Sequence, residues 1–217
     1  MRAIVLPVKR LDDAKGRLAP VLAHLERAAL TLAMLEDVID ATELLPGWET
    51  WVLSPDEAVL EVAARRGVTP IAEDRPPLTN AIRQAEEEAQ ARGATALAVL
   101  LPDTPLVTAA SLTRAVHTLG PVVVAPARDE TGTNLLLRRP PVSIPSSFGR
   151  DSYRKHLEAA ARDDVPIAVV EHAELAFDLD VPDDILTVLN ARRAGRARQV
   201  LRDLDLTGRL GVAAQEG

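Results

Sequence analysis

Hydrophobic and polar positions follow two patterns that alternate along the chain. Short uninterrupted apolar runs are typical of strands buried on both faces, and between them apolar residues recur every three or four positions, as on one face of a helix. The runs predict strands at 3–8, 50–53, 68–72, 97–101, 121–125, 135–138 and 167–170. The periodic stretches predict helices at 21–45, 56–66, 80–92, 109–119, 151–162 and 185–198. This alternation predicts an α/β fold in three layers, with a mostly parallel central sheet and right-handed crossovers.

The chain has no internal repeat and no linker that would divide it. Its 217 residues suit one large α/β domain and are too few for two comfortable ones. We therefore expect a single domain over residues 1–190, followed by a helical or irregular tail over residues 191–217.

Composition narrows the possible partners. The 25 Lys and Arg residues are outnumbered by 32 Asp and Glu residues, for a net charge of -7, which argues against general binding of nucleic acid or anionic membranes. Cysteine is absent, which excludes disulfides and thiolate metal sites and suits a reducing compartment. The apolar run after Met1 is too short for a signal peptide or a membrane span. We expect a cytoplasmic protein.

Acidic residues stand where two predicted strands end. The buried run 97–101 stops at Pro102 and is followed directly by Asp103, and Asp178 and Asp180 follow the last strand. Parallel strands release their loops at the same edge of a sheet, which is where open α/β folds bind ligands. Asp103 and either Asp178 or Asp180 would then converge on one divalent cation, since two carboxylates with phosphate oxygens and water are the usual Mg²⁺ arrangement. The alternative for Asp178 is an ordinary loop carboxylate. The alternative for Asp103 is a residue that opens a turn or caps the helix that begins near Thr108.

Two neighbouring acids have a simpler explanation. Asp183 and Asp184 follow Pro182 in the first turn of a predicted helix, where negative charge favours the helix dipole. We interpret both as structural.

The loop after the first strand concentrates positive charge. Lys9, Arg10, Lys15 and Arg17 lie between a buried strand and a long helix, a place where backbone N–H groups already favour anions. A phosphate site is the natural interpretation, although the loop has neither the Walker pattern nor the dinucleotide-binding glycine pattern. The alternative is a solvated, charged loop without a ligand.

Later loops offer further polar groups. The turn at Thr131–Asn134 presents hydroxyls and an amide that suit a phosphate or carboxylate, or it is a plain turn. Gly149 and Ser152 at a helix start indicate a second anion pocket, unless Ser152 serves only in capping. The four histidines are scattered, and we expect His156 on the surface.

Five segments carry a shared pattern when they are taken together and in order: Pro7–Leu18, Leu101–Leu106, Gly132–Leu137, Phe148–His156 and Phe177–Ile185. In this order they resemble one enzyme family, the guanylyltransferases of deazaflavin coenzyme F-420 biosynthesis, called CofC or FbiD. The resemblance runs from Met1 to about Leu189.

The resemblance implies a Rossmann-like nucleotidyltransferase domain, similar to those of molybdenum-cofactor and sugar nucleotidyltransferases. It implies guanylyl transfer from GTP to phosphoenolpyruvate or 2-phospho-L-lactate, with release of pyrophosphate. The matching positions give Asp103 and Asp180 as Mg²⁺ ligands and Lys15 as a catalytic residue. They also give Lys9, Lys15, Arg17 and Asn80 for the nucleotide, and Thr133, Asn134, Gly149 and Ser152 for the acceptor acid.

The chain departs from the family pattern in two loops. Gly16 is the only glycine of the first loop, where the wider superfamily is glycine-rich, and Glu130 follows Asp129 where the family often has glycine. Other readings remain open: a nucleotidyltransferase for a sugar phosphate or molybdopterin, a glycosyltransferase using an Asp-x-Asp pair such as Asp178 and Asp180, or a non-catalytic nucleotide-binding module. The long amphipathic helices are also compatible with a homodimer.

Overall fold

A twisted sheet forms the middle layer of the computed structural model, which describes residues 1–192, 195–206 and 208–211. The predicted strands are all present, in the spatial order β3-β2-β1-β4-β6-β5-β7. The paired strands run parallel except β6, which is antiparallel to both neighbours. Their bounds are β1 (Arg2–Pro7), β2 (Glu49–Ser54), β3 (Thr69–Ala72), β4 (Ala96–Leu100), β5 (Val122–Pro126), β6 (Thr133–Arg138) and β7 (Ile167–Val169).

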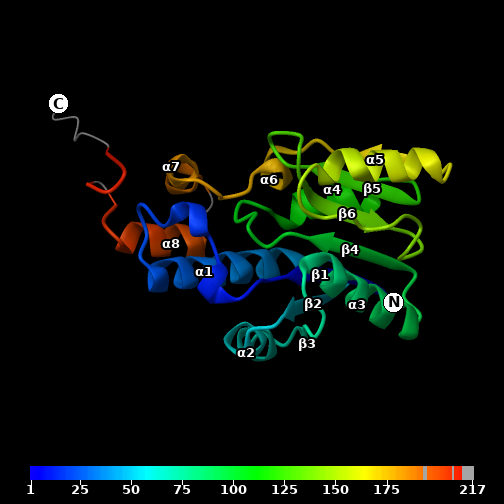
Figure 1. The fold of residues 1–217 in the computed structure, drawn as a ribbon, viewed down its shortest axis with the longest axis horizontal. Coiled ribbons are helices and arrows are strands. Elements are labelled where there is room, and N and C mark those ends of the chain that lie inside the picture. The colour runs from blue at the N-terminus through cyan, green and yellow to red at the C-terminus, as the bar shows by residue number, and fades with distance from the viewer. Residues whose placement is uncertain (193–194, 207, 212–217) are drawn as a thin grey trace.

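Helices cover both faces of this sheet (Figure 1). Helices α1, α2 and α4 pack on the face that carries Ile4 and Leu6 of β1, and α3 and α5 pack on the opposite face. Because Ala3–Pro7 of β1 is buried on both sides, this part of the strand is apolar without interruption. The predicted three-layer, mostly parallel fold is confirmed. The bounds are α1 (His24–Thr42), α2 (Glu57–Arg65), α3 (Leu78–Ala91), α4 (Ala109–His117), α5 (Ser152–Arg162), α6 (Ala173–Ala176), α7 (Pro182–Asn190) and α8 (Arg196–Asp203).

The single helix predicted at 185–198 is wrong, because α7 ends at Asn190 and α8 begins at Arg196. Asp37 of α1, only 2% exposed, accepts hydrogen bonds from the N–H groups of Arg196 (2.8 Å) and Ala197 (2.9 Å). A side chain from a distant element thus starts a new helix within a stretch of good helix formers.

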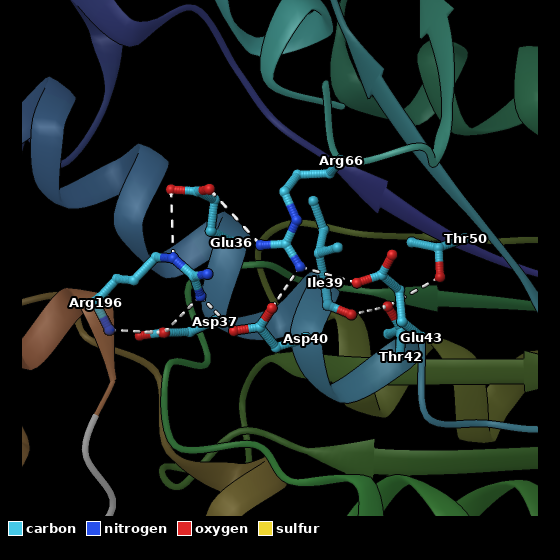
Figure 2. A network of polar contacts seen from close by, with 9 residues as sticks. All are labelled: Glu36, Asp37, Ile39, Asp40, Thr42, Glu43, Thr50, Arg66 and Arg196. Carbon is cyan, nitrogen blue, oxygen red and sulfur yellow. Dashed lines mark hydrogen bonds and ion pairs between the residues drawn. The ribbon is translucent and has the colours of Figure 1, made fainter. Parts of the chain in front are cut away.

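Helix α8 lies beside α1, at the end of the molecule away from α5 (Figure 1). Asp40 of α1 pairs with Arg196 of α8 and with Arg66 at the end of α2 (Figure 2). The acidic face of α1 thus holds α2 and α8 against α1. The described part of the C-terminal segment is therefore packed on the domain. No helix in the described ranges is long and apolar enough to cross a membrane.

Candidate active site

A cavity of about 570 Å³ lies at the carboxyl edge of β1 and β4, between the first loop, the loop after β4 and the start of β6. It is where the strand order of the sheet predicts a ligand site. The residues predicted for the site all line it except Asn80: Lys9, Lys15, Arg17, Asp103, Thr133, Asn134, Gly149, Ser152 and Asp180. The structure therefore gathers residues that lie up to 171 positions apart in the sequence around one hollow.

Lys15 joins the two acids predicted to bind metal. Its Nζ lies 3.0 Å from Asp103 Oδ2 and 2.8 Å from Asp180 Oδ1, and its side chain is 9% exposed. Burial by itself would lower the pKa of Lys15, but the two carboxylates outweigh it and raise that pKa above its usual value. Lys15 is therefore a buried, charged ammonium held between two carboxylates.

The negative charge around Lys15 is not fully compensated. Asp178 lines the same cavity, and burial together with the charges of Asp103 and Asp180 raises its pKa to about 6. Asp103 Oδ1 is buried without a hydrogen-bond partner. Within the described ranges no group of three or more His, Asp or Glu side chains is arranged as a metal site. The unpartnered carboxylate oxygen and the crowded acids nevertheless fit a small, hard cation.

Asp103 does not cap the helix that follows it. Thr108 is the N-cap of α4, and its Oγ1 accepts the N–H of Ser111 at 3.1 Å. The capping interpretation of Asp103 is therefore wrong, and its carboxylate is left for Lys15 and the cavity.

Asp180 is held in place by Asp184. Asp184 is 3% exposed, and its Oδ2 accepts the N–H groups of Asp180 (2.8 Å) and Val181 (2.9 Å) at the start of α7. Its Oδ1 accepts from Arg128 at 2.7 Å. Burial would raise the pKa of Asp184, but these hydrogen bonds keep it below its usual value. The structural role predicted for Asp184 is confirmed, and it orients the neighbouring Asp180.

The opposite side of the cavity is formed by β6 and the start of α5. Thr133 and Ser152 are each 1% exposed, and the Ser152 N–H donates to Gly149 O at 3.1 Å. The side-chain amide of Asn134 donates to the carbonyls of Leu175 (3.0 Å) and Ala176 (3.2 Å). Asn134 therefore ties β6 to α6, which leads directly into the acidic segment.

Two residues of the loops beside β6 and α5 have left-handed backbones. Gly149 has φ +107°, a value that side chains disfavour. Glu130 has φ 56°, so it adopts the conformation that a glycine would take most easily at this place. Asp129 closes the turn by accepting the N–H (3.0 Å) and the hydroxyl (2.8 Å) of Thr131. The loop thus keeps a glycine-type turn with Glu130 in it.

The expectation that His156 lies on the surface is wrong, because the residue is fully buried. Its Nδ1 lies 3.0 Å from Thr133 Oγ1, and its Nε2 accepts the N–H of Ser147 at 2.9 Å. Burial, with smaller effects of the Arg138 and Lys155 charges, lowers the pKa of His156 to about 4. The periodicity of α5 could have predicted this burial, since the buried positions 152, 156, 159 and 160 form one helical face.

The other three predicted nucleotide contacts, Lys9, Arg17 and Asn80, are exposed or only partly buried. Asn80, in the first turn of α3, donates from its amide to Pro76 O at 3.2 Å and does not line the cavity. The side chain of Arg17 is 75% exposed, with Nη1 3.6 Å from Asp180 Oδ2. Lys9 is an exposed residue of the cavity wall.

Known proteins match this chain in sequence and in fold. A family model described as "Guanylyl transferase CofC like" matches residues 1–215. A phosphoenolpyruvate guanylyltransferase of Rubrobacter xylanophilus is 40% identical over 184 residues, which cover 83% of this chain and 90% of that protein. A 3-phospho-D-glycerate guanylyltransferase of Phenylobacterium zucineum is 36% identical over 211 residues, which cover 94% and 97% of the two chains.

Solved structures share the fold at low sequence identity. A protein from Desulfovibrio desulfuricans G20 superposes with a TM-score of 0.77 at 19% identity, over 97% of this chain and 98% of the other. A nucleotidyl transferase from Methanothermobacter superposes with a TM-score of 0.61 at 18% identity, over 94% of this chain and 99% of the other. The sequence matches carry the assignment, and the chain belongs to the CofC-like guanylyl transferase family.

Proposed function

We propose that this protein transfers GMP from GTP to the phosphate of a small phosphorylated three-carbon acid, phosphoenolpyruvate or 2-phospho-L-lactate, in coenzyme F-420 biosynthesis. The observation that carries the proposal is the position of Asp103 and Asp180 across Lys15 in the same cavity as Thr133, Gly149 and Ser152. One end of the cavity thus suits a metal-bound triphosphate, and the other suits a small anion. The names of the relatives support an acceptor that carries both a phosphate and a carboxylate.

The proposed cofactor is Mg²⁺, held by Asp103 and Asp180. In support, Asp103 Oδ1 is buried without a partner, and burial together with the charges of Asp103 and Asp180 raises the pKa of the neighbouring Asp178. When bound, Mg²⁺ would neutralise charge on the α-phosphate and on the leaving pyrophosphate. Lys15 compensates the carboxylates in the absence of a metal, and we propose that it turns to the triphosphate when GTP and Mg²⁺ enter.

The proposed reaction is a direct transfer that forms no covalent intermediate with the enzyme. A phosphate oxygen of the acid attacks the α-phosphorus of GTP in line and forms a new P–O bond. The bond from the α-phosphorus to the bridging oxygen of the β-phosphate breaks, and pyrophosphate leaves with the electron pair. The attacking phosphate is already an anion, so no general base is needed. Lys15, Lys9 and Arg17 offset the charge of the triphosphate and the pyrophosphate.

The remaining predicted residues bind the two substrates at their ends. Thr133, Gly149 and Ser152 would hold the phosphate and carboxylate of the acid, and Asn134 would support them by fixing β6 to α6. Leu78 lines the cavity, whereas Asn80, two residues later in α3, does not. Asn80 would therefore contact only a part of the nucleotide that extends past Leu78.

Pyrophosphate release tests this proposal. The protein is incubated with GTP, Mg²⁺ and, separately, phosphoenolpyruvate, 2-phospho-L-lactate, 3-phospho-D-glycerate or a sugar 1-phosphate. Release with a three-carbon acid supports the proposal, and release only with the sugar phosphate contradicts it. GTP binding without any release would identify a non-catalytic nucleotide-binding module.

The metal ligands have a matched control. Asp103→Asn should abolish turnover with little change in thermal stability, because it removes one of several crowded charges. Asp183→Asn is the control, since Asp183 is exposed on α7 and does not line the cavity. Full activity of Asp103→Asn would remove this carboxylate from the mechanism.

A further inference from the structure

The hydrogen bonds of His156 determine where its ring proton lies. The backbone N–H of Ser147 can only donate, so His156 Nε2, 2.9 Å away, must accept and cannot carry a proton. In the neutral ring the proton is therefore on Nδ1. That nitrogen lies 3.0 Å from Thr133 Oγ1, so the imidazole donates to the hydroxyl of Thr133.

This donation orients the Thr133 hydroxyl. Thr133 Oγ1 accepts from the imidazole with one lone pair, and its own hydrogen must then point away from Nδ1. Thr133 lines the cavity, although only 1% of it is exposed, so a hydrogen turned away from Nδ1 can point into the space that we assign to the acceptor acid. A hydroxyl whose proton is directed this way is a ready donor to an anionic oxygen.

The same ring also fixes the facing wall. Ser147, bound by Nε2, directly precedes Phe148 and Gly149, which both line the cavity. The Phe148 ring packs edge-on against the imidazole, with ring centroids 5.3 Å apart and an interplanar angle of 68°. His156 thus connects β6, the loop before α5 and α5 itself from behind the cavity, without lining it.

We propose that His156 is a positioning residue for the acceptor acid: its Nδ1–H holds Thr133 so that the hydroxyl donates its proton to an anionic oxygen of the acid. The inference rests on the proposed function, because it places an anionic acceptor in this part of the cavity. It adds a residue outside the cavity wall that determines how tightly the acid is held. GTP binds on the side of Lys15, so its binding does not depend on this bond.

Two substitutions separate the two bonds of the ring. Asparagine has an amide nitrogen near the position of Nδ1 and retains a donor for Thr133, whereas glutamine reaches the position of Nε2 and retains an acceptor for Ser147. Loss of a hydrogen bond to a charged group weakens binding about ten- to hundredfold. His156→Gln should therefore raise the KM of the acid about tenfold or more, and His156→Asn should raise it less than about threefold. The KM of GTP should be unchanged in both variants.

The controls separate positioning from general loss of structure. His117→Gln changes an exposed histidine of α4 and should leave both KM values unchanged. Thr133→Val should match His156→Gln, and the double variant should be no worse than either, because both remove one interaction. Equal rises of both KM values in His156→Gln, or additive effects in the double variant, would overturn the proposal. If the wild-type protein releases no pyrophosphate with any acid, the proposed function fails instead.

A measurement on the wild-type protein tests the same proposal even if the variants fail to fold. ¹⁵N NMR of protein labelled at histidine distinguishes the two neutral tautomers and the imidazolium. Between pH 6 and 8 we expect His156 in the neutral form with its proton on Nδ1, because this range lies above the lowered pKa of the ring. A ring protonated at Nε2 in that range would overturn the proposal.

Discussion

Replacing Lys15 by methionine should make the protein less stable without metal and more responsive to Mg²⁺. The substitution keeps the unbranched apolar stem of the side chain but removes the ammonium that lies 3.0 Å from Asp103 and 2.8 Å from Asp180. The carboxylates would then repel each other and Asp178, with only the exposed Arg17, 3.6 Å from Asp180, left to offset them. Removing one partner of a fully buried ion pair costs about 3–5 kcal/mol.

The expected cost here is smaller, because the side chains of Asp103 and Asp180 are 28% and 39% exposed and water screens them. We expect a loss of about 2 kcal/mol, which for a chain of this size lowers Tm by about 4–8 °C. The ammonium also repels a divalent cation: two unit charges 4 Å apart interact by about 4 kcal/mol at an effective dielectric constant of 20. Even a third of that, about 1.4 kcal/mol, changes affinity tenfold.

The assay is thermal unfolding at increasing Mg²⁺ concentration. Without Mg²⁺, Lys15→Met should unfold at a lower temperature than the wild type. The Mg²⁺ concentration that gives half of the Mg²⁺-dependent rise in Tm should be at least about tenfold lower for Lys15→Met than for the wild type. Its turnover should nevertheless fall, because the triphosphate loses a cation. Arg17→Met is the matched control, since its side chain is 75% exposed and makes only a 3.6 Å contact with Asp180. Equal Mg²⁺ responses of the wild type and Lys15→Met would refute the reasoning.

Three further predictions concern single positions. Asp178 has a pKa of about 6 in the folded protein against about 3.9 unfolded, so it contributes a loss of stability as pH rises from about 4 to 6. Asp178→Asn should therefore raise Tm relative to the wild type at pH 8 but not at pH 4, and a pH-independent difference would contradict this. Glu130→Gly should increase the free energy of unfolding by about 0.5–1 kcal/mol in urea titrations, because it relieves a left-handed backbone; a destabilised variant would be the opposite result. Asp37→Ala should lower the free energy of unfolding by about 1–2 kcal/mol and speed amide hydrogen exchange in α8, since it removes the carboxylate that accepts the first N–H groups of α8, among them that of Arg196 (Figure 2); unchanged exchange in α8 would argue against this capping role.

The central strands were predictable from the sequence because they are buried on two faces and therefore carry apolar runs, as in Ala96–Leu100 of β4. The edge strands β3 and β7 are only partly buried, and short stretches rich in apolar residues indicated them. The direction of β6 was not predictable, because a buried strand has the same pattern whether it runs parallel or antiparallel. The break between α7 and α8 depends on Asp37, which is distant in sequence. Helix α6, with four residues, is too short to show periodicity.

The candidate site was predictable as far as topology determines it. Asp103 closely follows β4, so its place at the carboxyl edge follows from the sheet. Asp180 does not follow a neighbouring strand, because α6 lies between it and β7, and β7 is three strands away from β4. The N–H of Leu179 donates to Asp103 O at 3.0 Å and holds the two acidic segments together. The bridging position of Lys15 and the use of the Asn134 amide to hold α6 depend on side-chain contacts that no pattern encodes. The surface position predicted for His156 is wrong because the prediction rests on the scatter of the histidines and not on the position of His156 on the buried face of α5.

The central claim is that the phosphate of the acid attacks the α-phosphorus of GTP, and isotope labelling tests it most directly. Phosphoenolpyruvate labelled with ¹⁸O in its nonbridging phosphate oxygens is incubated with the protein, GTP and Mg²⁺, and the products are analysed by mass spectrometry. We predict a guanosine diphospho-acid that carries all of the label, together with unlabelled pyrophosphate. Label in the pyrophosphate, or unlabelled GMP as the nucleotide product, would contradict the account.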